Sequence, residues 1–168
     1  IKWWRVGEWS RQHDPDWQPD GTITVYDNQM RDNKKLNYSE DAMKFSRIVS
    51  IDPEGYDVDV VYDGKRDNFY SNIRGKHQVL PSGEVLITSS MQGRVMMVNE
   101  SGETVFEFLN TYDDKNNLLV SEAVWLPHDY FDFPVGQGVC EAGGLRETQW
   151  TPGSRMSIHY VVKDSTRR

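Results

Sequence analysis

An internal repeat limits the possible folds of this sequence more than any other feature. Residues 18–25 (QPDGTITV) resemble residues 80–87 (LPSGEVLI) at an offset of 62, and residues 46–52 (SRIVSID) resemble residues 93–99 (GRVMMVN) at an offset of 47. The offsets differ by 15 residues, which predicts an insertion in the first copy, in the polar segment 29–43, as a surface loop. Each copy then has the length of one blade of a β-propeller, about 45–50 residues.

Short alternating runs that end in turn residues predict antiparallel strands, whereas helical periodicity is nearly missing. Residues 57–60 alternate Asp and Val, which predicts valines on one face and carboxylates on the other, and residues 104–108 alternate in a similar way. Four turns contain a glycine that we expect at positive φ: Gly21, Gly55, Gly83 and Gly102. The sequence therefore predicts an all-β fold.

The predicted architecture is a partial β-propeller of four-stranded antiparallel blades. The two clear repeats span about residues 12–62 and 76–109, and residues 1–6 form a separate strand before them. A four-stranded blade must stack on its neighbours to bury both faces, and two blades cannot close a ring. We therefore expect that either further sequence or association of identical chains completes the propeller.

The rest of the chain is less regular. Residues 118–127 could begin a third blade, and residues 156–162 could add another strand. We assign residues 1–131 to propeller blades and residues 132–168 to a tail that could hold a further partial blade.

Composition excludes several classes of function. The chain has 168 residues and a net charge of −7, and none of its Lys/Arg runs exceeds two residues, so we expect no nucleic-acid partner. Mean hydropathy is −0.71, and no apolar stretch approaches the ~20 residues of a membrane-spanning helix.

Cys140 is the only cysteine, which excludes an internal disulfide and argues against a cysteine-based zinc site. We expect neither a metal nor a cofactor. Because the sequence opens on Ile1, we expect a fragment or a trimmed chain.

Several motifs occur in the order found in one known family. A tryptophan-rich run precedes a Gln-His-Asp motif, a Pro-Asp-Gly turn and a Tyr-Asp-Asn strand end, at residues 3–7, 12–14, 19–21 and 26–28. Related motifs follow at residues 75–83, 93–95, 121–123 and 126–131. Over roughly residues 3–131 the chain resembles the bacterial arylsulfotransferase family.

The resemblance implies a six-bladed propeller that transfers sulfate from a phenolic sulfate ester to a phenol. The family uses no nucleotide donor and works through a sulfated histidine, which on the motif match is His13. Its site also uses a His-x-Asn pair and an arginine from a preceding blade, and this sequence contains no such pair. We therefore expect this chain by itself to be incomplete for catalysis. The resemblance also favours a periplasmic or other extracytoplasmic location.

Four side chains are candidates for the site. His13 is the catalytic candidate, because a neutral imidazole is a competent nucleophile near pH 7. The substrate-binding candidates are His77, Arg74 and Trp17. His77 could donate to a sulfate oxygen or could be a satisfied turn histidine, Arg74 could bind the anion or lie in a solvated loop, and Trp17 could stack on a phenyl ring or serve packing. Asp14 follows His13 in a strand and should face the opposite side, so we do not assign it as the partner that orients His13.

Two further expectations concern the whole protein. The alternative to an enzyme is a non-catalytic β-propeller that serves as a binding or structural scaffold. The second expectation is a homo-oligomer, because three blades per chain would let two chains close one ring and bury the exposed strand edges.

Overall fold

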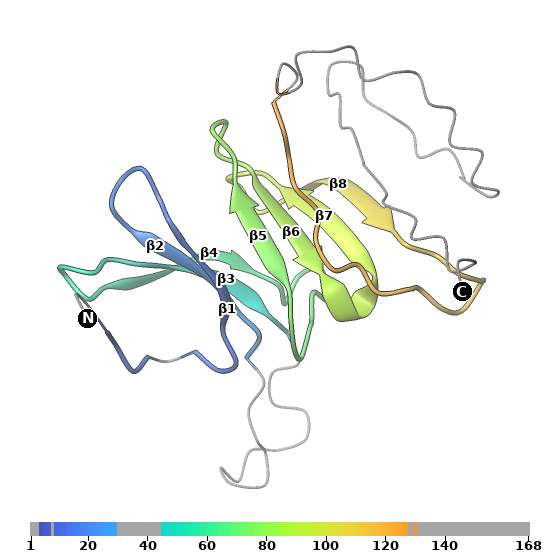
Figure 1. Cartoon of the computed structure of the whole chain (residues 1–168), viewed down its shortest axis with the longest axis horizontal. Coiled ribbons are helices and arrows are strands. Elements are labelled where there is room, and N and C mark those ends of the chain that lie inside the picture. The colour runs from blue at the N-terminus through green and yellow to red at the C-terminus, as the bar shows by residue number, and fades with distance from the viewer. Residues whose placement is uncertain (1–3, 8, 30–44, 128–129, 131–168) are drawn as a thin grey trace, which may run out of the picture. The chain divides into compact units, whose positions relative to one another are not determined.

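A computed structural model describes residues 4–7, 9–29, 45–127 and 130 of the chain (Figure 1). The chain divides into two compact units, residues 1–124 and 125–168, and almost all described residues belong to the first. The fold is all-β, as expected, and the described residues form eight strands in two four-stranded sheets. The domain boundary expected after residue 131 adjoins residues outside the described ranges and stays a prediction.

The strands of each sheet follow one another in space in the order of the sequence, and every neighbouring pair is antiparallel. The first sheet consists of β1 (His13–Trp17), β2 (Ile23–Asp27), β3 (Arg47–Ile51) and β4 (Val58–Asp63). The second consists of β5 (Lys76–Val79), β6 (Val85–Ser89), β7 (Arg94–Val98) and β8 (Thr104–Leu109), with the 3₁₀ helix η1 (Ser90–Gln92) between β6 and β7. This four-stranded meander is the topology of a propeller blade.

Strand pairing confirms the internal repeat. Ile23 pairs with Ile51 across β2 and β3, and the residues at offsets 62 and 47, Val85 and Val98, pair across β6 and β7. The extra residues of the first copy fall between β2 and β3, where the insertion was predicted. Residues 30–44 of that insertion lie outside the described ranges.

Three of the four predicted glycine turns have the expected backbone. Gly21, Gly83 and Gly102 have φ of 89°, 94° and 75°. The prediction for Gly55 is wrong, because Tyr56 has the positive φ, 64°. This turn closes one residue later than the others: the Tyr56 amide donates to the carbonyl of Asp52, four residues back, at 2.9 Å.

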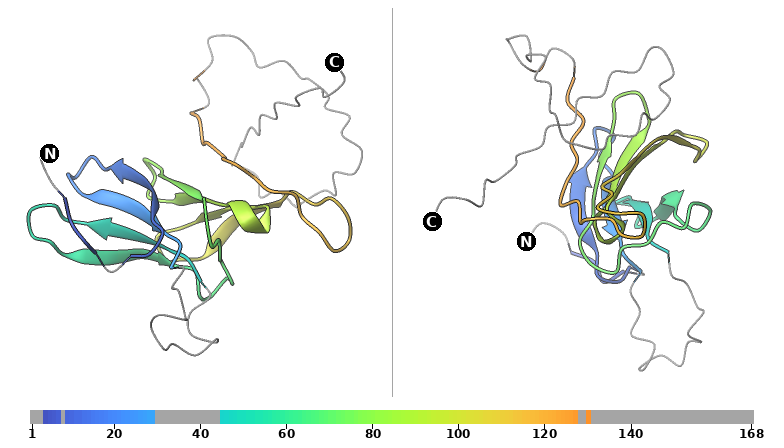
Figure 2. Two further views of the ribbon diagram at one scale, coloured as in Figure 1. Left: turned by 60° about the horizontal axis from the view of Figure 1, so that its bottom comes forward. Right: turned by 90° about the vertical axis from the view of Figure 1, so that its right-hand side faces the viewer.

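The two sheets share a hydrophobic core and lie side by side in Figure 1 and in the left view of Figure 2. Its buried members are Tyr26, Ile48, Tyr62, Phe69, Val85, Ile87, Met96 and Val98. Phe69 lies in the connection from β4 to β5 and packs edge-on against Tyr26, with ring centroids 5.4 Å apart. All five residues of β2 and of β6 are buried, which shows that both faces of these strands are covered.

The other expected strands have a mixed outcome. Within the described ranges, residues 4–6 and 118–127 form no strand, and residues 156–162 lie outside these ranges. The segment after β8 returns to the second sheet, where the amide of Ala123 donates to Thr88 Oγ1 at 3.0 Å. A third blade stays a prediction. None of the helices in the described ranges could span a membrane.

Candidate active site

His13 opens β1 and is partly exposed. Its Nδ1 lies 2.8 Å from the carbonyl oxygen of Arg11 and 2.7 Å from Asn28 Oδ1. Its Nε2 makes no hydrogen bond to any residue that the structure describes. One ring nitrogen is therefore fixed by the chain, and the other is free of described partners.

A β-bulge in β1 lies directly after His13, between His13 and Asp16. His13 pairs with Tyr26, and the pairing with β2 shifts between His13 and Asp16. In the second sheet Lys76 pairs with Thr88, the repeat counterpart of Tyr26. The structural counterpart of His13 is therefore Lys76, at an offset of 63 rather than 62, and His77 follows it. The extra residue of the bulge causes this shift.

Unusual backbone conformations gather around His13. Six described non-glycine residues have positive φ, and four of them belong to this region: Arg11 (55°), Asp14 (51°), Gln29 (50°) and Arg74 (61°). Arg11 and Asp14 flank His13, Gln29 follows Asn28, and the Arg74 carbonyl contacts Asn28. Non-glycine residues adopt this conformation at a cost, and such residues are concentrated at functional sites.

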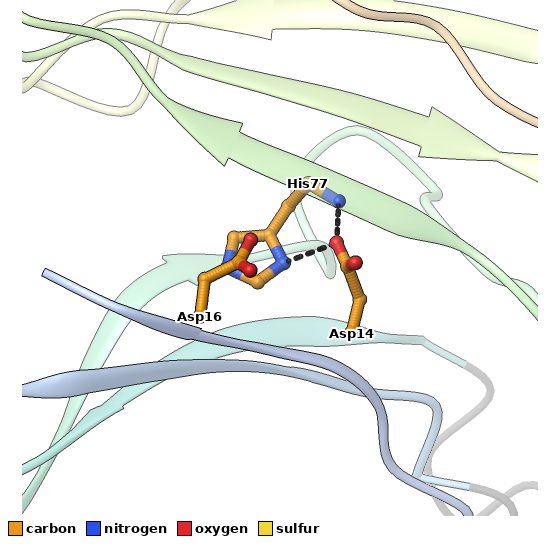
Figure 3. Close-up of side chains that lie close together, drawn as sticks. All are labelled: Asp14, Asp16 and His77. Carbon is orange, nitrogen blue, oxygen red and sulfur yellow. Dashed lines mark hydrogen bonds and ion pairs between the residues drawn. The ribbon is translucent and has the colours of Figure 1, made fainter.

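His77 is 2% exposed and joins the two sheets (Figure 3). Its backbone amide donates to Asp14 Oδ2 at 2.7 Å, and its Nδ1 lies 3.2 Å from the same oxygen. Its Nε2 is 2.7 Å from Thr24 Oγ1. His77 of β5 thus contacts both β1 and β2. These contacts fit a structural histidine that joins the sheets, although the contact of Nδ1 with Asp14 is an ion-pair distance without hydrogen-bond geometry. A role in substrate binding stays a prediction.

Asp14 contacts His77, and none of the described hydrogen bonds or ion pairs joins it to His13. Burial alone would raise the pKa of Asp14. Hydrogen bonds and charge from His77, together with the charge of Lys76, outweigh burial and hold this pKa below its usual value. Lys76 Nζ lies 3.5 Å from Asp14 Oδ1 and 3.0 Å from Glu122 Oε1. Asp14 is therefore a charged group at the junction of the sheets.

Asp14, Asp16 and His77 are the one group of side chains within the described ranges that could hold a metal ion, with ligand atoms within 4.8 Å of one another. Thr24 already contacts His77 Nε2, and the ammonium group of Lys76 is near Asp14. Because Lys76 and Thr24 already contact two of the three groups, Asp14 and His77, we assign no metal ion here.

The remaining candidates lie near the surface. Arg74 is exposed, and its carbonyl, rather than its guanidinium, accepts a hydrogen bond from Asn28 Nδ2 at 2.7 Å. Trp17 ends β1 and is 69% exposed. Their roles in substrate binding stay predictions.

Sequence reasoning did not single out Asn28. It predicted that Asp27 caps backbone N–H groups beside a turn, but not that Asp27 anchors the segment before β1. Asp27 accepts from the amides of Ser10 and Gln29 at 2.9 and 3.0 Å, and from Arg47 Nε at 2.8 Å. It thereby fixes the segment before β1 to the end of β2. The only signal for either residue was the Tyr-Asp-Asn strand end at residues 26–28.

A comparison with protein families gives a match that spans both sheets. The family model described as Arylsulfotransferase (ASST) matches residues 1–111. The chain belongs to the arylsulfotransferase family. This confirms the resemblance found in the sequence and supports an arylsulfotransferase-like function with phenolic substrates. No curated protein matches the chain.

Proposed function

We propose that the protein containing this chain transfers sulfate from a phenolic sulfate ester to a phenol, with His13 as the nucleophile. The observation that carries the proposal is a partly exposed His13 whose Nε2 has no hydrogen-bond partner among the described residues, in a region that matches the arylsulfotransferase family. Nδ1 is fixed to the chain, so the ring is oriented while its second nitrogen remains available for reaction.

The reaction would proceed in two half-reactions. In the first, Nε2 attacks sulfur, the N–S bond forms, and the S–O bond to the aryl group breaks, so the phenolate leaves with the electron pair. In the second, the oxygen of the acceptor phenol attacks sulfur, the N–S bond breaks, and the electron pair returns to Nε2. The phenolate product takes up one proton and the acceptor loses one, so no net proton is consumed. This order predicts ping-pong kinetics.

Sulfuryl transfer places negative charge on oxygen atoms, so positioned cations and N–H donors should accelerate it. We propose Arg74 for the anion and Trp17 for the aryl ring. Lys76 is less suitable because Asp14 and Glu122 already neutralise it. His77 is retained as a third substrate-binding proposal, which would require it to give up its contact with Thr24.

The complete site would need parts beyond the two sheets. We propose that a six-bladed ring is completed either by further sequence or by a second copy of the chain, and that the protein works outside the cytoplasm. A closed ring would bring a preceding blade, with the His-x-Asn pair and the arginine of the family, beside His13.

The test is incubation of the folded and assembled protein with a chromogenic aryl sulfate and a phenol. We expect release of the coloured phenolate and a sulfated peptide containing His13, and loss of both in His13→Ala. His77→Ala should reduce turnover if His77 binds substrate, and should lower only stability if it is structural. A folded sample without turnover and without sulfated His13 would support the non-catalytic scaffold instead.

A further inference from the structure

We propose that Asn28 is a positioning residue that fixes the tautomer of His13, with the ring proton on Nδ1 and the lone pair on Nε2. The chemical consequence of this assignment rests on the proposed function, whereas the tautomer itself can be observed separately. Asn28 is 0% exposed and follows β2, next to the end of the strand that pairs with β1.

The orientation of the Asn28 amide follows from its neighbours. One end of the amide lies 2.6 Å from the carbonyl oxygen of Ser71 and 2.7 Å from that of Arg74. Both oxygens are acceptors only, so this end must be the NH₂ group, which has two donors. The opposite orientation would place three oxygens together in a buried space. The amide oxygen therefore faces His13.

The tautomer of His13 follows in the same way. Its Nδ1 has two close partners, the Asn28 oxygen at 2.7 Å and the Arg11 carbonyl oxygen at 2.8 Å. Neither can donate, so Nδ1 must carry the proton and share it between the two in a three-centre hydrogen bond. A neutral imidazole has a single N–H group, which leaves Nε2 with an unprotonated lone pair.

This arrangement suits both half-reactions. The proton stays on Nδ1 while Nε2 forms the N–S bond, so the sulfated ring carries positive charge close to two oxygen acceptors. The same proton makes the ring a better leaving group, because neutral imidazole departs when the N–S bond breaks. The opposite tautomer would point an N–H group at the sulfate ester and could not attack.

The amide is not a general requirement of the fold. At the offset of 62 the second repeat has Ser90 in place of Asn28. Ser90 is also buried, but its hydroxyl group has no hydrogen-bond partner among the described residues. The hydrogen-bonding amide is thus specific to the repeat that contains His13, which favours a role beyond folding.

The direct test is a long-range ¹H–¹⁵N correlation spectrum of the folded, ¹⁵N-labelled chain, recorded with the imidazole of His13 in its neutral form. We expect His13 to show a protonated Nδ1 and an unprotonated Nε2. A protonated Nε2 in the unmodified protein would overturn the proposal. This measurement does not depend on catalysis or on the stability of any variant.

Variants then test the role of Asn28. In Asn28→Ala we expect a larger fraction of the Nε2-protonated tautomer and a rate of His13 sulfation that falls by about tenfold or more. Ser90→Ala is the matched control and should change neither. An unchanged tautomer in folded Asn28→Ala would overturn the role of Asn28.

The two proposals can fail separately. The expected tautomer without any sulfation of His13 would support the assignment and contradict the proposed function. Sulfation of His13 with the opposite tautomer at rest would contradict the assignment and support the function.

Discussion

At the scale of single residues, the bulge in β1 directs two adjacent side chains to different partners. His13 contacts Asn28 within its own sheet, and Asp14 contacts His77 of the second sheet. Adjacent side chains of a regular strand also point to opposite faces. In β1, however, Asp14 has a positive φ of 51°, and the pairing of β1 with β2 shifts by one residue between His13 and Asp16. What the bulge determines is therefore the partner that each side chain meets, Asn28 for His13 and His77 for Asp14.

The first prediction concerns Asp14→Asn, which keeps a side chain that tolerates positive φ but removes the charge. The folded-state pKa of Asp14 lies below the usual 3.8. Its ionic contribution is therefore fully present above the unfolded pKa and is lost as pH falls through the folded pKa. We expect the variant to lose about 1–3 kcal/mol of unfolding free energy at pH 6, and the difference from wild type to vanish in strong acid.

Chemical denaturation across pH measures this difference. Asp59→Asn is a suitable control, because Asp59 is exposed on β4, and its effect should stay within about 0.5 kcal/mol. A difference for Asp14→Asn that persists unchanged at low pH would show that its charge is not responsible.

The residue scale also marks the limit of sequence reasoning. His13 could be chosen because its motif is continuous in sequence, and its strand neighbour Asp14 was correctly left unassigned as its partner. The role of Asn28 could not be predicted, because its acceptors lie 43 and 46 residues away. The burial of His77 likewise depends on Asp14 and Thr24, which belong to the other repeat.

At the scale of elements, alternation predicted the outer strands with unequal success. In β8 the burial alternates as expected, with Val105 51% exposed between partly buried neighbours. In β4 the two valines share one face, as expected, because Val58 and Val60 pair with Ile51 and Val49. That face is poorly covered at Val60, which is 50% exposed, whereas Tyr62, beyond the register shift, is buried. The pairing of β3 with β4 shifts between Ile48 and Val49, and such a shift reverses which side chains face the core.

The second prediction concerns the connection that enters β5. A Cβ atom on Gly75 would lie 2.2 Å from the ring of Tyr26, and Gly75 also has φ of 109°. Gly21 has a similar φ of 89°, but nothing lies within 4 Å of its Cβ position. We expect Gly75→Ala to lower the unfolding free energy clearly more than Gly21→Ala, because only the former adds a clash to the backbone strain. Thermal denaturation of both variants measures this difference. Equal losses of unfolding free energy would show that backbone strain, and not the clash with Tyr26, determines the effect.

At the scale of the whole molecule, the two sheets depend on the same buried side chains. Tyr26 and Ile48 come from the first sheet and Ile87 and Met96 from the second, with Phe69 from the connection among them. The repeat could be predicted from the sequence because it preserves strand and turn patterns. The common core could not, because a repeat does not reveal which faces meet.

The third prediction is that the two sheets unfold as one unit. We expect a single urea transition with the same midpoint by tryptophan fluorescence and by far-ultraviolet circular dichroism. Phe69→Ala should lower the unfolding free energy by about 3–5 kcal/mol without splitting this transition. Val105→Ala, at an exposed position of β8, is the control and should have little effect. Two separate transitions in the unmodified protein would contradict a shared core.

The position of the insertion between β2 and β3 determines how freely its sequence can change among relatives of this chain. It departs from the chain just after Asn28 and Gln29, which are buried, and it returns at Ser46, whose hydroxyl group donates to the carbonyl of Ser71 at 3.2 Å. Both ends of the insertion are therefore fixed by contacts outside it, whatever residues lie between them. Doubling the length of such a segment adds only about 0.6 kcal/mol of closure entropy. Relatives of this chain can therefore exchange the sequence between Gln29 and Ser46 while the framework that orients the imidazole is inherited intact.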